Sequence, residues 1–159
     1  MTNQQPLKKR LVRLISSKEA HVPFIDAIHG LSFDDCILKP QGVPYSIYDL
    51  VFHCKVTQWD ILQYVKNPHH ISPEWPLGYW PEKNHHPSRK IWQDNIDNFL
   101  SDQKDMINII ENPNTDLFEI FPNGSGHDLF REIMVLCDHN AYHLGQIVLI
   151  RKMQNLWGN

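Results

Sequence analysis

The sequence contains no long hydrophobic run. A membrane-spanning helix needs about 20 consecutive apolar residues, and no stretch of the chain approaches that length. The first residues, MTNQQ, also lack the apolar core of a secretory signal peptide. We therefore expect a cytoplasmic protein without a membrane partner.

Positive charge and cysteine are also scarce. Fifteen Lys and Arg residues against 18 Asp and Glu residues give a formal net charge of −3. This balance offers no basic field for a phosphate backbone, so nucleic acid is not an expected partner. The three cysteines, Cys36, Cys54 and Cys137, are an odd number without metal-type spacing, which predicts reduced thiols. We expect Cys54 and Cys137 to be small residues of the core.

No segment alternates polar and apolar residues over the length of a strand. Apolar residues instead recur at helical spacing in four segments, and a chain of 159 residues fits one domain. The pattern predicts a single all-α domain over residues 1–159, built as a four-helix bundle with long loops between the helices. The expected helices cover residues 7–15, 46–66, 88–111 and a C-terminal segment from 127 or 128 to 156.

Short sequence motifs predict both ends of the helix over residues 46–66 and a close contact in the C-terminal helix. Ser46 and Asp49 have the spacing of a capping box, in which each side chain satisfies the backbone N–H of the other residue. Pro68 follows the expected end of the same helix. Gly145 lies inside the C-terminal helix at a cost in helix propensity, which favours a close contact at that position.

The connection over residues 67–87 is unusually long, and loops of this length are usually functional or disordered. Trp75, Tyr79 and Trp80 argue against disorder. Two interpretations stay open: a rigid flap over one end of the bundle that lines a pocket, or a loop whose aromatic side chains only cover the core. Two pairs of adjacent histidines also lie in this connection, and neighbouring loop histidines rarely chelate one ion together. These pairs are His69–His70 and His85–His86, and their role stays open.

The most informative pattern is a pair of histidines four residues apart, His139 and His143, in the C-terminal helix. Four residues of helix place both imidazoles on one face, where they can bind the same metal ion. A transition metal needs at least one more protein ligand, and His53 in the second long helix is the best candidate. The spacing alone also fits surface or hydrogen-bonded core histidines, because the sequence holds 10 histidines. Asn140 stands where a zinc peptidase carries its general base, so that signature is absent.

Four further side chains are candidates for supporting roles. Gln146 shares the face of the histidine pair and is a catalytic candidate that could hydrogen-bond a metal-bound ligand; Tyr142 is a second candidate. For both, a purely structural role is equally open. Thr57, one turn beyond His53, either orders the site or bonds its own helix backbone. Asp60 lies two turns from His53, too far to touch it, and is expected to face another polar group.

Three segments carry a resemblance to a known family. They are residues 44–53 (PYSIYDLVFH), 72–81 (SPEWPLGYWP) and 138–146 (DHNAYHLGQ). In this combination the chain resembles the DinB/YfiT-like superfamily of metal-dependent enzymes, over almost its whole length. The metal triad of that superfamily, a second-helix histidine followed far downstream by His-x-x-x-His, maps without substitution onto His53, His139 and His143.

The resemblance implies a four-helix bundle, commonly homodimeric, with a divalent transition metal such as Zn, Ni, Fe or Mn held by the three histidines. Characterised relatives transfer low-molecular-weight thiols such as bacillithiol or mycothiol to electrophiles, or isomerise maleylpyruvate with a thiol, and others are described as hydrolases. We therefore expect a metal-dependent thiol S-transferase or hydrolase with a small-molecule substrate. The alternative is a non-catalytic metal-binding or small-molecule-binding bundle that keeps the triad for stability or sensing.

Overall fold

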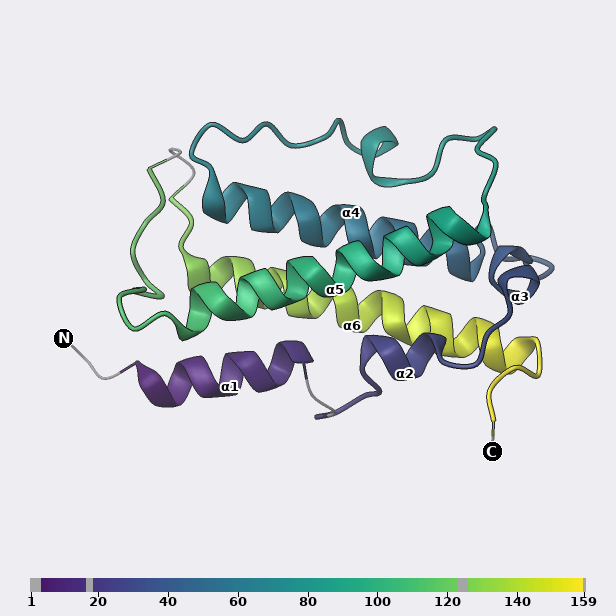
Figure 1. Ribbon diagram of the computed structural model, residues 1–159, viewed down its shortest axis with the longest axis horizontal. Helices are drawn as coiled ribbons and strands as arrows, with labels where there is room; N and C mark the ends of the chain where they lie inside the picture. The colour runs from purple at the N-terminus through teal and green to yellow at the C-terminus, as the bar shows by residue number, and fades with distance from the viewer. Residues whose placement is uncertain (1–3, 17–18, 123–125, 159) are drawn as a thin grey trace.

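The structure is a computed structural model that describes residues 4–16, 19–122 and 126–158 (Figure 1). Over these residues the chain is helical, and strand-like pairing is limited to one isolated bridge between Ile120 and Asp128. The predicted all-α class is therefore confirmed. The helices are α1 (Gln5–Ser16), α2 (Phe24–Ile28), α3 (Phe33–Ile37), α4 (Ile47–Lys66), the 3₁₀ helix η1 (Leu77–Tyr79), α5 (Arg89–Glu111) and α6 (Leu129–Met153).

The four long helices lie where the sequence predicts them. The capping box at the start of α4 is present, with the Ser46 N–H donating to Asp49 Oδ2 at 2.9 Å and the Asp49 N–H donating to Ser46 Oγ at 3.1 Å. At the other end of the chain, α6 stops at Met153, short of the expected residue 156. Asn155 adopts a left-handed backbone with φ of 58°, which ends the helix there.

Two short helices, α2 and α3, were not expected from the sequence. Each has five residues, little more than one turn, and a single turn shows too little periodicity to be recognised. A local signal does exist for α3, because Ser32 and Asp35 form a second capping box. In Figure 1, α3 lies beside the start of α4, and α2 lies along the C-terminal half of α6.

The long helices pack lengthwise, with α4 against α5 and α6, and α1 against α5 and α6. In Figure 1, α4 and α5 run in the same direction and α6 runs in the opposite one. A helix of 20 residues is about 30 Å long, so the chain has to return along α4 before α5 can start. The connection over residues 67–88 makes this return. It lies along the side of α4 and not over one end of the bundle, where the flap interpretation placed it (Figure 1).

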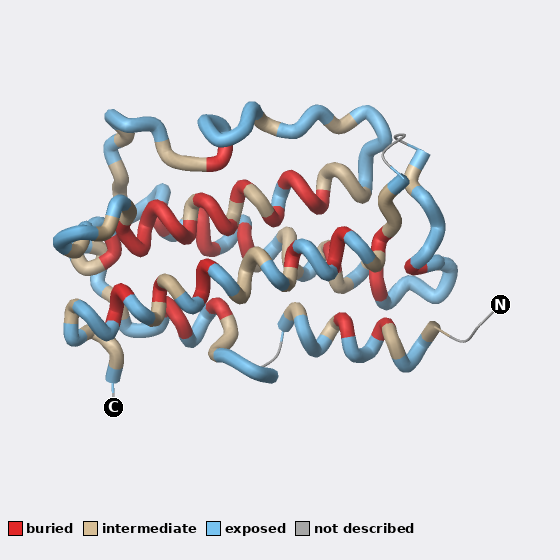
Figure 2. Tube along the Cα trace, turned by 180° about the vertical axis from the view of Figure 1, so that it is seen from behind, coloured by how far each residue is buried: buried red, intermediate tan, exposed pale blue. Residues whose placement is uncertain are grey.

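The core consists of two hydrophobic clusters along the helices, and buried residues gather on the sides of the long helices that face one another (Figure 2). Cys36 and Cys54 are fully buried in the first cluster. The prediction of a core position is therefore confirmed for Cys54, whereas Cys137 is only partly buried and packs against the second cluster. The fully buried amide of Gln58 donates to the Phe99 carbonyl on α5 and accepts from Asn140 on α6 at 3.3 Å.

Two surface properties of the helices bear on possible partners. Gly145 is exposed, and a Cβ atom added there would meet nothing within 4 Å, so the close contact expected at this glycine does not occur within the described chain. None of the helices described is sufficiently long and apolar to cross a lipid bilayer.

Candidate metal centre

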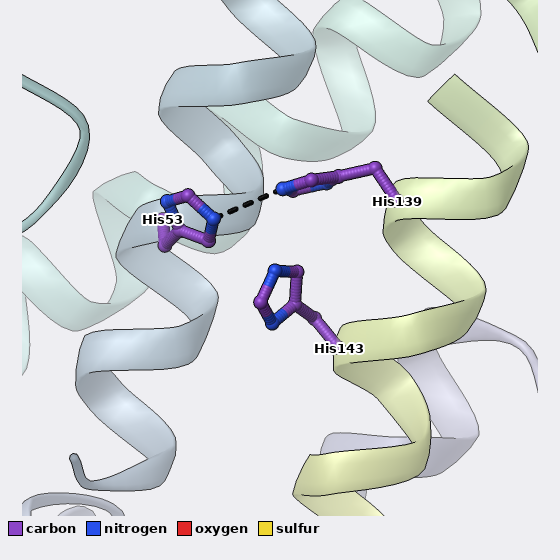
Figure 3. A group of neighbouring side chains, drawn as sticks. All are labelled: His53, His139 and His143. Atoms are coloured by element: carbon purple, nitrogen blue, oxygen red, sulfur yellow. Dashed lines mark hydrogen bonds between the residues drawn. The ribbon is translucent and has the colours of Figure 1, made fainter. Parts of the chain in front are cut away.

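Three histidines from two helices meet between α4 and α6. Figure 3 shows His53 on α4 pointing toward His139 and His143, which lie one turn apart on α6. The Nε2 atoms of His53 and His139 are 3.0 Å apart, and the three ring centroids are separated by 4.5 to 4.8 Å. Among the described residues this is the one group of three His, Cys, Asp or Glu side chains close enough to hold a metal ion.

The spacing of the ring nitrogens fits a metal ion. Zinc–imidazole bonds are about 2.0–2.1 Å long, so nitrogens on one tetrahedral zinc ion lie roughly 3.3 Å from each other. The separation between His53 and His139 is close to this value, and one nitrogen from each of the three rings lies within 4.8 Å of the others.

Hydrogen bonds on the far side of two rings orient them for this role. The Nδ1–H of His53 donates to the Tyr79 carbonyl at 3.0 Å, and the Nδ1–H of His143 donates to Gln146 Oε1 at 2.8 Å. Each bond fixes the tautomer in which Nε2 carries the free lone pair. Gln146 thus forms a hydrogen bond with His143, one of the three proposed metal-binding residues.

The local environment keeps the imidazoles neutral. Burial is the largest effect and lowers the pKa of His53 and of His143 below the usual value. Burial and the two neighbouring histidines lower the pKa of His139 to about 4. At neutral pH the rings are therefore neutral imidazoles, and no imidazolium has to lose its charge before a metal binds.

The long connection covers His53. Trp80 stacks on the ring of His53 with centroids 4.1 Å apart. The indole of Trp80 also stacks with the ring of Tyr45, at 5.9 Å between centroids. Tyr79 is buried, whereas Trp75 is 69% exposed and 6.5 Å from His53 between centroids. The sequence identified these aromatic residues, but it did not reveal that one of them stacks on a proposed ligand.

A cavity of about 340 Å³ lies beside His139, between α4, α6 and the connection. Its volume is within the range of small-molecule sites. Apolar side chains form much of its wall, and Trp75 and Tyr79 contribute to it, so the connection does line a pocket. The apolar contributors are Ile61, Tyr64, Trp75 and Val135.

One carboxylate in the cavity wall was missed by sequence reasoning. Glu132 is only 3% exposed and pairs with Arg131 at 2.7 Å and with His127 at 3.0 Å. It lies seven residues before His139, two turns away on the same face of α6, and this spacing is the signal that could have identified it.

The second carboxylate of the wall, Asp60, has both of its oxygens engaged. Its two oxygens contact His70 Nε2 and the Tyr79 hydroxyl, each at 2.6 Å. The expectation that Asp60 faces a polar group other than His53 is confirmed. Asp60 is therefore not free to act as a general base in this arrangement, whereas both contacts of Glu132 use its Oε1 atom.

The remaining candidates lie at the edge of the site. The Thr57 hydroxyl is buried and has no hydrogen-bond partner, although Thr57 contributes to the cavity wall beside His139. A buried hydroxyl without a partner is costly in free energy. Tyr142 is 65% exposed, with its ring edge-on to His143 at 4.9 Å between centroids.

The two histidine pairs of the connection do not converge on an ion. His70 bonds to Asp60, and His85 stacks on Tyr48 with centroids 5.3 Å apart. The other member of each pair, His69 or His86, is exposed. Neighbouring histidines in this connection therefore have different surroundings and different contacts.

Comparison of the chain with protein-family models, curated proteins and solved structures finds no match. Its function is therefore argued from the geometry of the site.

Proposed function

We propose that this chain is a metal-dependent enzyme of the DinB/YfiT-like superfamily, a four-helix bundle that binds one divalent transition metal through His53, His139 and His143. The observation that carries the proposal is the convergence of three neutral imidazoles across two helices, from positions 86 residues apart in the case of His53 and His139. Burial keeps the imidazoles neutral, and the hydrogen bonds that Nδ1 donates in His53 and His143 leave the lone pair on Nε2.

Three neutral ligands leave the full charge of a divalent ion available, and such an ion supplies Lewis acidity that acidifies a bound thiol or water at neutral pH. The protein contributes the cavity beside His139, whose volume admits a small molecule. We assign the chain to the thiol S-transferase or hydrolase type on this basis.

The source of the nucleophile follows from the cysteines. Burial raises the pKa of Cys36 and of Cys54 to about 12, and that of Cys137 to about 11, so none of these thiols ionises at neutral pH. Because thiolates rather than thiols are nucleophilic, the chain does not use its own cysteines. A small-molecule thiol or a water molecule has to provide the attacking atom.

The proposal includes a homodimer that uses the exposed face of α6. Val135, Tyr142 and Leu149 are 38%, 65% and 58% exposed. They follow one another at intervals of seven residues, which places them on one side of the helix. Gly145 lies open between Tyr142 and Leu149, where a second helix can approach closely.

Turnover with added thiols tests the activity. The protein is freed of metal with a chelator, reloaded with Zn, Ni, Fe or Mn in turn, and assayed with a panel of low-molecular-weight thiols against monobromobimane and a chloronitrobenzene. The expected result is thiol-dependent turnover that disappears with the metal and returns on reloading. Metal-dependent thermal stabilisation without turnover would instead support the non-catalytic binding bundle.

A further inference from the structure

His53 donates one hydrogen bond to a residue that lies outside the two helices of the triad. The acceptor is the backbone carbonyl of Tyr79, at the end of η1 in the connection between α4 and α5. A backbone acceptor on an irregular segment orients an imidazole only if that segment is itself held in place.

We propose that Tyr79 and Asp60 are positioning residues for His53: Asp60 anchors the Tyr79 side chain, and the Tyr79 carbonyl fixes the tautomer and the ring orientation of His53. This inference rests on the proposed metal centre and adds to it a residue of the connection that orients one of the metal ligands.

The anchor is short and buried. The Tyr79 hydroxyl donates to Asp60 Oδ2 at 2.6 Å, and both residues are 9% exposed. Burial and the bond to Asp60 raise the pKa of Tyr79 to about 12, so the hydroxyl keeps the proton that it donates. A charge-assisted hydrogen bond of this length is among the stronger side-chain contacts in proteins.

Asp60 also holds the beginning of the connection. Its Oδ1 atom contacts His70 Nε2 at 2.6 Å, so the two oxygens hold separate points of the connection, and only Oδ2 contacts the residue whose carbonyl bonds His53. Asp60 lies seven residues after His53 on that helix, about 10 Å along its axis. The helix that carries His53 therefore also fixes the segment that orients it.

Packing restricts the backbone just before Tyr79. A Cβ atom on Gly78 would lie 2.5 Å from Cβ of Pro73, so only glycine fits beside that ring. The Gly78 N–H donates to the Glu74 carbonyl at 2.7 Å, and the Tyr79 N–H donates to the Pro76 carbonyl at 3.1 Å. Side-chain anchor and backbone packing together place the Tyr79 carbonyl.

The test compares Tyr79→Phe, which removes the anchor but keeps the carbonyl, with His70→Ala as the matched control. The control removes the other contact of the same carboxylate and leaves Tyr79 bonded. Zinc affinity is measured by competition with a chromogenic chelator, and thermal stability is measured on the same samples. Gly78→Ala is a second variant, because it displaces the backbone without removing any hydrogen-bonding side chain.

We expect Tyr79→Phe and Gly78→Ala to weaken zinc binding roughly tenfold, at the lower end of the range for partners of metal-bound histidines, and His70→Ala to leave it within about twofold. The proton-coupled ¹⁵N NMR spectrum of the metal-free protein reports the tautomer of His53, which a general loss of stability does not change. His53 is expected as the Nδ1–H tautomer in the native protein and as a mixture of tautomers in Tyr79→Phe.

Unchanged zinc affinity and an unchanged His53 tautomer in Tyr79→Phe would overturn the inference. Equal weakening of zinc binding by His70→Ala and Tyr79→Phe would overturn it as well, because affinity would then follow the stability of the connection. Absence of zinc binding by the native protein would instead refute the proposed metal centre, and the tautomer comparison would still decide the relation between Tyr79 and His53.

Discussion

The indole ring of Trp80 lies flat on the imidazole of His53, with centroids 4.1 Å apart and ring planes 6° from parallel. The two residues belong to different parts of the fold, one to the long connection and the other to α4. One side of the proposed ligand is thereby shielded by an aromatic surface. The connection is thus part of the site.

This contact predicts an optical signal. Cobalt(II) bound at the triad should quench tryptophan fluorescence, because Trp80 is in direct contact with His53. Trp80→Phe should lose a large part of the quenching, whereas Trp157→Phe, a change in the C-terminal segment, should retain it. Equal quenching in native protein and in Trp80→Phe would show that cobalt binds elsewhere.

A second prediction concerns thiol reactivity. Cys36 and Cys54 are buried and the pKa of each is raised to about 12, so neither should react with a disulfide reagent such as DTNB in the native protein at pH 7.5. All three cysteines should react after denaturation. Turnover of thiol substrates should survive in Cys54→Ser, and its loss in a folded variant would contradict the external origin of the nucleophile.

The pH dependence of stability gives a third prediction. The pKa of His139 is about 4 in the folded protein and close to 6.5 in an unfolded chain, so between these values the unfolded state binds a proton that the folded state does not. The free energy of unfolding of the metal-free protein should therefore decrease as the pH is lowered from about 6.5 to about 4. His53 and His143 are shifted in the same direction and add to the effect.

Chemical denaturation across this pH range, with chelator present, measures the slope. The control is His139→Gln, which removes one titrating group and should show a smaller decrease over the same range. An identical slope in both proteins would show that His139 does not titrate as expected.

A fourth prediction concerns the outer face of α6. If Val135, Tyr142 and Leu149 form a dimer interface, Leu149→Glu should place a charge in it and yield monomers, as measured by light scattering coupled to size-exclusion chromatography. Ile91→Glu is the matched control, because Ile91 is an equally apolar, exposed residue on α5. Monomeric native protein, or a dimer that withstands Leu149→Glu, would contradict this interface.

Much of the fold was predictable because its helices are long. Helical spacing located α1, α4, α5 and α6, and the capping box of Ser46 and Asp49 gave the start of α4. The side on which the connection lies could not be predicted, because it depends on α5 running parallel to α4. That direction is set by packing between distant segments and not by any local pattern.

The candidate site was predictable only in its side chains. Spacing singled out His139 and His143 within one helix, and the structure brings His53 to them. The acceptor that orients His53 is a backbone oxygen, and a carbonyl has no sequence signature. The contact of Trp80 with His53 depends in the same way on the path of an irregular segment.

Metal content of the purified protein tests the central claim most directly. Zinc titration with mass-spectrometric metal analysis should find one ion per chain in the native protein, and close to none in His53→Ala, His139→Ala or His143→Ala. The control His69→Ala changes an exposed histidine outside the triad and should retain one ion. Unchanged metal content in folded triad variants would contradict the account.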